Sequence, residues 1–247
     1  MSFDDVSVLR PAAISRGINA RPIATSVQMA VRDHLRREIL VGALTGGTRL
    51  QQADVAKDYG VSITPVREAL RDLAAEGLVD ISPFSGATVH DPTLKELEDI
   101  YRVRAELAPL TVQDAIRNID LAELDHAAEI VRAMATASEP DVWTEENREF
   151  HHLLDGATRN EQLTRVMRHL ADLSTIYVAV SIGRDAVRRG RANEDHEEIL
   201  DAYRRRDVDR AVEVTLRHMT ETQELVRLAF RAQAPQDART NHVSERS

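Results

Sequence analysis

The sequence predicts a mainly α-helical protein in two parts: a small N-terminal part that ends in a β-hairpin and a larger part made only of helices. Hydrophobic residues make up 43% of the 247 residues, whereas aromatic residues make up 4%. This balance favours helices packed on helices over a sheet-rich sandwich. Apolar residues also recur at helical spacing over most of the chain, with one short interruption near residues 78–89.

An arm and one helix begin the N-terminal part. Residues 1–24 show no sustained periodicity and are predicted to be flexible, with three arginines that either contact phosphate or remain solvated. From residue 26 onward, apolar residues recur every four positions and predict a helix that ends at a glycine-rich stretch. The residues of this apolar face are Val27, Val31, Leu35 and Ile39.

Two further helices follow, separated by one glycine. We expect a short helix at Gln52–Tyr59, broken by Gly60, and a third helix that begins after Ser62, a suitable N-cap residue. Pro65 falls in the first turn of this third helix, where a missing N–H is tolerated. The apolar positions of the third helix form one stripe: Val66, Ala69, Leu70, Leu73 and Ala74.

The periodicity changes after Gly77. Leu78–Ile81 and Ala87–Val89 are short extended runs around a turn at Ser82–Gly86, and this pattern predicts a β-hairpin. Three helices and a hairpin in this order form a winged helix-turn-helix, which we place at residues 25–91.

The exposed face of the third helix carries side chains that suit DNA. Thr64, Arg67 and Arg71 lie at positions i, i+3 and i+7, opposite the apolar stripe. A hydroxyl and two guanidinium groups suit phosphate and guanine contacts in a major groove. Gly86 would let the tip of the wing approach the DNA backbone closely. The alternative is an interaction module whose arginines are solvated.

The net charge of −9 argues at first against nucleic-acid binding, because phosphate contacts need lysine and arginine. Most of the acidity lies in residues 92–231, which hold twenty basic and twenty-eight acidic residues. Residues 25–91 hold seven basic and nine acidic residues. DNA affinity must therefore come from a few placed residues and from doubling in a homodimer.

The absence of cysteine excludes disulfides, thiolate metal sites and a cysteine nucleophile. No apolar stretch approaches the ~20 residues that span a bilayer, and the N-terminus does not resemble a signal peptide. We therefore expect a cytoplasmic protein without a membrane segment.

Residues 92–231 are predicted to form an all-helical domain that binds an effector and dimerises, followed by a disordered tail at residues 232–247. Its helices are expected near residues 94–117, 121–137, 142–157, 161–182, 192–206 and 208–231.

A possible metal site lies in this helical part. Asn147 and His151 are four residues apart and project from one helix face. His196 and His218 fall on two later helices joined by a short turn, which can bring both to the same depth. An amide oxygen with three imidazoles suits Zn²⁺, Ni²⁺ or Mn²⁺. The alternative is that these are ordinary surface or core histidines.

The run Val61-Ser62-Ile63-Thr64-Pro65-Val66-Arg67-Glu68-Ala69-Leu70, followed by Gly86-Ala87, resembles the N-terminal domain of GntR-family transcription regulators. The resemblance extends over most of residues 26–90. It implies that Ser62, Thr64, Arg67 and Gly86 lie against DNA. Ile63 replaces an arginine that is frequent in the family, which implies a shifted operator preference.

The helical part is similar to the ligand-binding FCD domain of the FadR subfamily of these regulators, on the runs Asn147-Arg148-Glu149-Phe150-His151, His196-Glu197-Glu198-Ile199-Leu200 and His218-Met219. This resemblance implies that Asn147 and the three histidines hold a divalent cation whose coordination a small carboxylate effector completes. Asn147 replaces a frequent aspartate, keeping the oxygen donor and losing a negative charge. Arg104 falls where the family often has an arginine that faces the effector; the alternative is an exposed ion pair with Glu106 or a neighbouring helix.

Three functions follow from these patterns. The first, which we favour, is a ligand-responsive transcription regulator, usually a repressor, that binds a two-fold DNA operator as a homodimer. The second is a metal sensor in which the cation itself is the signal. The third is a metalloenzyme in which the metal activates water beside Glu149, Glu194 or Glu197. An attached DNA reader gives such an enzyme no evident purpose, so we expect no enzymatic activity.

Overall fold

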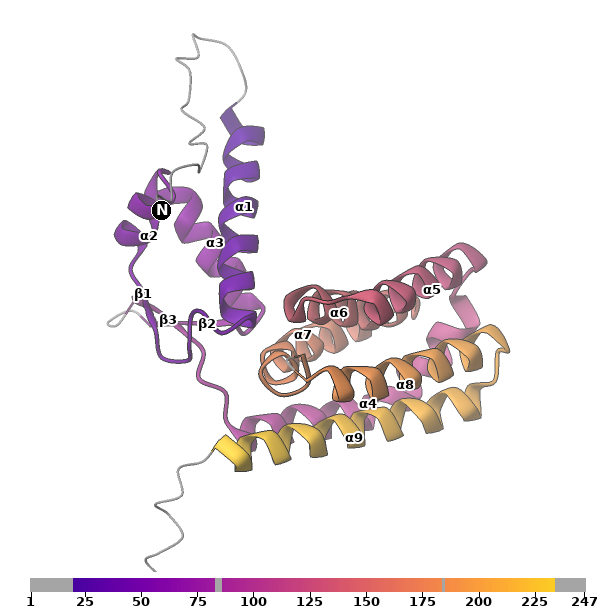
Figure 1. The fold of residues 1–247 in the computed structure, drawn as a ribbon. Helices are drawn as coiled ribbons and strands as arrows, with labels where there is room; N and C mark the ends of the chain where they lie inside the picture. Colours follow the sequence, from indigo (N-terminus) through magenta and orange to yellow (C-terminus); the bar gives the residue numbers. More distant parts are fainter. Residues whose placement is uncertain (1–19, 83–85, 184, 234–247) are drawn as a thin grey trace, which may run out of the picture.

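The structure is a computed structural model that describes residues 20–82, 86–183 and 185–233. The described residues form nine α-helices, one short π-helix and a three-stranded sheet. They are arranged as two blocks (Figure 1). The predicted fold, a winged helix-turn-helix followed by a helical bundle, is confirmed. Most of the predicted arm, the centre of the predicted hairpin turn and nearly all of the predicted tail lie outside the described residues.

The N-terminal block, here called the head, contains three helices and a small antiparallel sheet. Its helices are α1 (Ala20–Leu40), α2 (Gln52–Asp58) and α3 (Ile63–Ala75). Its strands are β1 (Arg49–Leu50), β2 (Val79–Ser82) and β3 (Gly86–Val89), in the order β1-β3-β2. In the hairpin, Val79 pairs with Val89 and Ser82 with Gly86.

The predicted apolar stripes form the core of the head. Helix α1 packs on α3 because the stripes of the two helices face each other. Val27 and Ala74 are partly buried. The other residues of the two stripes are each at most 3% exposed: Val31, Leu35, Ile39, Val66, Ala69, Leu70 and Leu73. Burial of this apolar surface is the main force that positions α3, whose opposite face is left to solvent.

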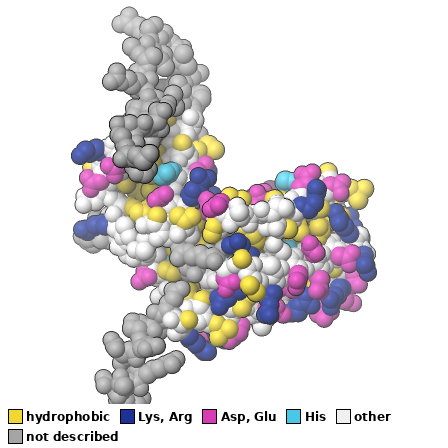
Figure 2. All heavy atoms as spheres, viewed as in Figure 1, with side chains coloured by type: hydrophobic (Ala, Val, Ile, Leu, Met, Phe, Trp, Pro, Cys, Tyr) yellow, Lys and Arg dark blue, Asp and Glu magenta, His cyan; other side chains and the backbone are white. Residues whose placement is uncertain are grey.

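The second block consists of α4 (Leu94–Asn118), α5 (Leu121–Thr136), α6 (Pro140–Gly156), α7 (Glu161–Val178), α8 (Ala186–Arg204) and α9 (Val208–Gln233). Helices α4 and α9 lie side by side, α6 packs between α5 and α7, and α8 contacts α5 and α9 (Figure 1). Acidic and basic side chains are interspersed over much of the visible face of this block (Figure 2). Among the described residues, no helix is both long enough and apolar enough to cross a bilayer.

Side-chain caps fix where several of these helices begin. Asp120 and Glu123 form a reciprocal capping box at the start of α5. Asn160 accepts a hydrogen bond from the Leu163 N–H at the start of α7. Asp185 accepts from two N–H groups at the start of α8. That cap explains why α8 begins at Ala186, six residues before the predicted start.

Three other boundaries differ from the predictions. Helix α1 begins at Ala20 rather than Ser26, and Pro22 falls in its first turn, where proline is tolerated. The predicted helix 161–182 ends at Val178 and continues as the π-helix η1 (Ala179–Gly183). Strand β1 was not predicted, because two residues are too few to show a period.

The two blocks are in contact along α1 and α3. Arg37 on α1 pairs with Asp141 on α6 at 2.9 Å, and Gly77, just after α3, packs against Leu173 of α7. In the connection between the blocks, the two ring nitrogens of His90 each lie 3.0 Å from a carboxylate, Asp80 on β2 and Glu96 on α4. One apolar cluster also extends from the head into α4, α7 and α9.

Candidate functional site

The exposed face of α3 holds most of the residues predicted to contact DNA. Ser62 occupies the N-cap position, but its side chain makes no capping hydrogen bond, so its hydroxyl is available to a ligand. Thr64, Arg67 and Arg71 are exposed on the same helix. Ile63 is 49% exposed beside them, so it lies on the same surface.

The two arginines of this face share one acidic neighbour. Glu68 lies 3.3 Å from Arg67 and 3.0 Å from Arg71. These exposed pairs are weak in water, so a phosphate can replace the glutamate at small cost. Gly86, at the start of β3, has a φ of +80° and open space around its Cα, as the close approach of a wing requires.

In the helical block, the three predicted histidines converge. Ligand atoms of His151 on α6, His196 on α8 and His218 on α9 all lie within 4.8 Å of one another. His196 is fully buried and His218 is 6% exposed. Burial lowers the pKa of His151, and the other two histidines lower it further. The neutral imidazole favoured by such an environment is the form that binds a metal.

Two observations indicate that this cluster fits a cation. Both ring nitrogens of buried His196 lack a hydrogen-bond partner among the described residues. An orphaned buried nitrogen is costly unless something binds it. His218 Nδ1 lies 3.2 Å from Asp195 Oδ2. That contact fixes the orientation of the His218 ring, as a carboxylate behind a metal-binding histidine does.

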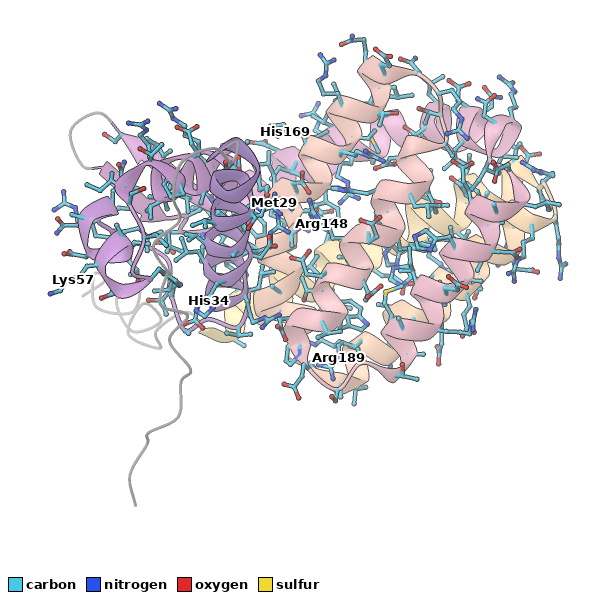
Figure 3. The ribbon with its side chains drawn as sticks, turned by 90° about the horizontal axis from the view of Figure 1, so that it is seen from above. Met29, His34, Lys57, Arg148, His169 and Arg189 are labelled. Atoms are coloured by element: carbon cyan, nitrogen blue, oxygen red, sulfur yellow. The ribbon has the colours of Figure 1, made fainter. Side chains whose placement is uncertain are left out.

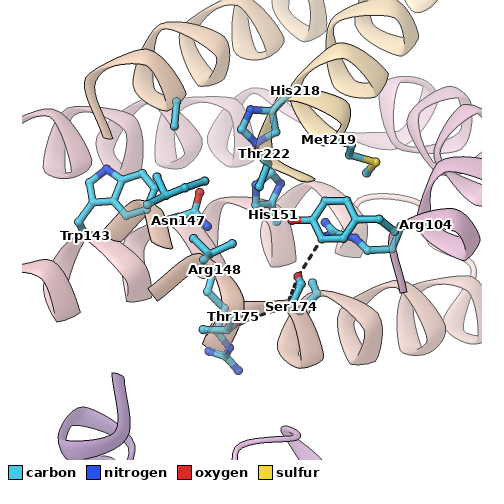
Figure 4. A pocket seen from close by; sticks show the side chains of 15 residues that line it. Arg104, Trp143, Asn147, Arg148, His151, Ser174, Thr175, His218, Met219 and Thr222 are labelled. Carbon is cyan, nitrogen blue, oxygen red and sulfur yellow. Dashed lines mark hydrogen bonds between the residues drawn. The ribbon is translucent and has the colours of Figure 1, made fainter. Parts of the chain in front are cut away.

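Asn147 lines the same cavity as His151 and His218. In Figure 4 it lies between Trp143 and His151, one turn before His151 on α6. Its oxygen is therefore placed near the histidines, and its role as a fourth ligand stays a prediction. The Trp143 indole N–H donates to Asn193 Oδ1 at 2.9 Å, which fixes the ring that forms this wall.

Arg104 reaches the cavity from α4. It is 5% exposed, and its guanidinium donates to Ser174 Oγ at 3.0 Å (Figure 4). The guanidinium also lies over the Tyr101 ring at 5.2 Å, while its Nε has no hydrogen-bond partner among the described residues. Glu106, the alternative partner considered from the sequence, is exposed on the solvent side of α4. Arg104 is therefore placed to bind an anion in the cavity.

The cavity around these residues is small. Its volume is about 30 Å³, enough for about two water molecules. A wider groove of about 300 Å³ lies between α8 and α9 on the other side of His218. The groove and the cavity share four lining residues: Ile182, Ala192, His218 and Thr222.

Sequence reasoning missed several residues of this site. Asp195 gave a signal, since it precedes His196 directly, but Glu149, Glu194 and Glu197 were weighed in its place, and all three are exposed. Ser174 gave no signal, because only the packing of α4 on α7 brings it to Arg104. Tyr101 lies three residues before Arg104 on α4, a spacing that does not by itself mark a site. The remaining histidines of the block do not join the cluster: His126, His152 and His169.

An ion-pair chain leads from this site to the head. Arg148 lines the cavity and pairs with Asp172 at 2.7 Å and with Glu145 at 3.6 Å. Glu145 in turn lies 3.4 Å from Arg36 on α1. In Figure 3, Arg148 lies where the helical block meets the head. The helix that carries Asn147 and His151 is thus tied to the helices that position the exposed face of α3.

Two family models match the chain. The model for bacterial regulatory proteins of the gntR family matches residues 28–89, and the FCD domain model matches residues 99–221. The chain belongs to the GntR family. Its head is the GntR-type domain and its helical block contains the FCD domain. The family comprises DNA-binding transcription regulators, not enzymes, in agreement with the sequence prediction.

Relatives of this GntR-family chain carry regulator names. The uncharacterized HTH-type transcriptional regulator YdhC of Bacillus subtilis is 30% identical over 57% of this chain and 65% of its own length. The regulator McbR of Escherichia coli is 36% identical over 42% of this chain and 48% of its own length. The chain thus spans less than two thirds of these two relatives. A gluconate operon transcriptional repressor of Bacillus licheniformis is 26% identical over 73% of both chains.

Solved structures show the same fold. The structure of E. coli McbR matches 83% of this GntR-family chain and 98% of its own chain, with a TM-score of 0.68 and 23% identity. The structure of a GntR-family member from Pseudomonas syringae matches 84% of this chain and 87% of its own chain, with a TM-score of 0.51 and 27% identity.

Proposed function

We propose that this GntR-family chain is a transcriptional repressor of the FadR subfamily. It would bind a two-fold DNA operator as a homodimer, and its FCD domain would bind a divalent cation together with a small carboxylate effector. The convergence of three imidazoles in a buried cavity, with both nitrogens of His196 unpartnered, carries this proposal. The repressor function is supported by the names of relatives that act on gluconate and D-xylose operons.

The DNA-binding part of the proposal is supported by the exposed face of α3. Thr64, Arg67 and Arg71 form a polar edge long enough to enter a major groove, and Gly86 lies at the turn end of the wing. One such helix reads few base pairs. Two copies in a homodimer raise the effective concentration of the second head and set the half-site spacing.

The cation would be held by His151, His196 and His218, with Asn147 as an additional oxygen donor. Such a donor set suits Zn²⁺, Ni²⁺ or Mn²⁺. The cation would supply a fixed positive charge that attracts a carboxylate. Asp195 orients His218 and returns a negative charge to the surroundings of the site, which the amide of Asn147 does not supply.

Arg104 would bind the effector carboxylate from the opposite side of the cavity. A buried guanidinium is well suited to a charge-assisted bond with a carboxylate. Ser174 holds the guanidinium in place, so little conformational entropy is lost when an anion binds.

A second candidate function is a metal sensor that takes no organic effector. The cavity volume of about 30 Å³ favours it, because a cation and one water fill that space and an acid requires side chains to move. Met219, which lines the cavity, is the flexible side chain that can open it.

The two candidates are separated by one titration. A labelled fragment from upstream of the protein's own gene is titrated with protein, and fluorescence anisotropy is read with chelator, with Zn²⁺, Ni²⁺ or Mn²⁺, and with cation plus a panel of small acids. A repressor with an effector releases DNA only when an acid is added to the cation-loaded protein. A metal sensor responds to the cation and ignores every acid. If DNA affinity does not change under any condition, both candidates are wrong.

A further inference from the structure

A second enclosed cavity lies behind the histidine cluster. Its volume is about 30 Å³, and it shares Arg104, His151 and Met219 with the first cavity. The two cavities therefore adjoin at these three residues. The other polar residues of its wall are Thr111, Asp155, Tyr203 and Thr215.

This second cavity contains two buried polar groups without partners. Asp155 is 8% exposed and its Oδ2 accepts no hydrogen bond from any described residue. Arg104 lines both cavities, and its Nε–H donates no hydrogen bond to any described residue. A buried carboxylate oxygen and a buried guanidinium N–H are both costly when unpaired. Asp155 lies one turn beyond His151 on α6, so one helix face carries Asn147, His151 and Asp155 in sequence.

The chemistry of these two groups selects the occupant. Arg104 offers a donor and Asp155 offers an acceptor, so the bound group must both accept and donate. A hydroxyl does both. An ammonium group donates to Asp155 but accepts nothing and is repelled by Arg104, and a methylene group does neither.

We propose that the cavity bounded by Arg104, Asp155 and Tyr203 is a hydroxyl subsite, so that the effector is a hydroxylated carboxylic acid. Its carboxylate occupies the first cavity, and its hydroxyl accepts from Arg104 Nε–H and donates to Asp155 Oδ2. The raised pKa of Asp155, to about 6 through burial, is the cost of keeping this acceptor in the interior. This inference rests on the carboxylate effector of the proposed function.

Two matched series of acids test the subsite. Propionate, lactate and alanine differ only in carrying hydrogen, hydroxyl or ammonium at one carbon, and succinate, malate and aspartate form the same series with a second carboxylate. Binding to the full-length, Zn²⁺-loaded protein is measured by calorimetry. In at least one series, the hydroxy acid should bind about 10- to 100-fold more tightly than the other two members, the range expected for hydrogen bonds to charged groups.

Substitution of Asp155 then tests whether this carboxylate causes the preference for hydroxy acids. Asp155→Leu removes the acceptor and fills the subsite with an apolar side chain, so the hydroxy acid and its plain counterpart should bind within about threefold of each other. Asp155→Asn keeps a neutral acceptor and should retain part of the preference, which covers the case in which the leucine variant does not fold. Asp125→Asn, at an exposed position on α5, should leave the preference unchanged.

The outcomes separate the subsite from the proposed function. If plain acids bind and release DNA but the hydroxyl brings no gain, the subsite holds only water and the inference fails while the function stands. A preference that survives Asp155→Leu also overturns the inference. If the cation binds and no acid of either series does, the subsite and the organic effector both fail.

Discussion

Arg36 of the head lies between two carboxylates, donating to Glu76 at the end of α3 at 2.9 Å and lying 3.4 Å from Glu145 of α6. Its side chain is 12% exposed, so this pairing is largely shielded from water. Arg36 therefore joins the helix that precedes the wing to the helix that carries Asn147 and His151.

Removing this guanidinium should destabilise the whole chain. Arg36→Met leaves the partly buried Glu76 without its ion-pair partner and Glu145 with Arg148 alone, and we expect the free energy of unfolding to fall by about 1 to 3 kcal/mol. Arg32→Met is the matched control, because Arg32 pairs only with exposed Asp33 and should change stability by less than about 0.5 kcal/mol. Urea denaturation measures both, and equal effects would show that Arg36 does not bridge the two blocks.

Alanine substitutions at two glycines distinguish the effect of backbone strain from the effect of contact between the two blocks. Gly60 and Gly77 both have positive φ, 64° and 74°, so alanine at either position is strained by about 1 kcal/mol. Only at Gly77 would a Cβ meet Leu173 of α7. Gly77→Ala should therefore lower the melting temperature by more than Gly60→Ala does. Equal shifts in a thermal denaturation experiment would mean that α7 moves aside without cost.

The histidine cluster should lose its cation when His196 is replaced. His196→Ala should abolish the rise in melting temperature that Zn²⁺ or Ni²⁺ gives, because binding to the folded state alone is what stabilises it. His169→Ala, at an exposed position on α7, should keep the full rise. Asp195→Asn should weaken cation affinity about 10- to 100-fold, as expected when a group that orients a ligand is removed. An unchanged affinity in this variant would leave Asp195 as a surface partner of Arg217 only.

Asp155 should make the protein less stable as the pH rises. Burial raises the pKa of its carboxyl from about 3.8 to about 6. Because the folded state holds the proton more tightly, the stability contribution is present below pH 4 and is lost as the pH rises through 6. Asp155→Asn should thus raise the free energy of unfolding at pH 8 by about 2 to 3 kcal/mol and give no gain at pH 4. A gain of the same size at both pH values would contradict the assignment to this carboxyl.

Arg67, exposed on α3, should contribute to DNA binding and not to the stability of the fold. Arg67→Ala should weaken operator binding about 10- to 100-fold and make the affinity less dependent on salt, without affecting stability. Arg165→Ala, which removes an exposed arginine of α7, serves as the control for loss of charge. A gel shift titration at two salt concentrations measures both effects.

Helices and strands could be predicted where residues close together in the sequence determine them. The four-residue spacing of apolar positions in α1 and the i, i+3, i+4 stripe of α3 gave both helices, and the change of period after Gly77 gave the hairpin. The start of α8 was missed because Gly190 argued for a loop, while the cap of Asp185 is visible only when its hydrogen bonds are known. The π-helix was missed because a shift of hydrogen bonding leaves no pattern in the sequence.

The site was predicted in part for the same reason. Asn147 and His151 share a face by spacing alone, which a sequence shows. The convergence of α6 with α8 and α9 was possible from the short turn between the two later helices, and the resemblance to known regulators made it the favoured expectation. Ser174 gains its position only from the packing of α7 on α4. Asp195, next to His196, and Asp155, four residues after His151, could have been found from their spacing.

Helix α6 presents its cavity residues and its ion pairs to the head roughly a quarter turn apart around its axis. Side chains extend about 5 to 6 Å from such an axis, so a roll of only about 10° moves their tips by about 1 Å. That displacement is comparable to the margin between a good hydrogen bond and a broken one. A ligand that turned α6 slightly at His151 would thus loosen or tighten the ion pair between Glu145 and Arg36 without a hinge.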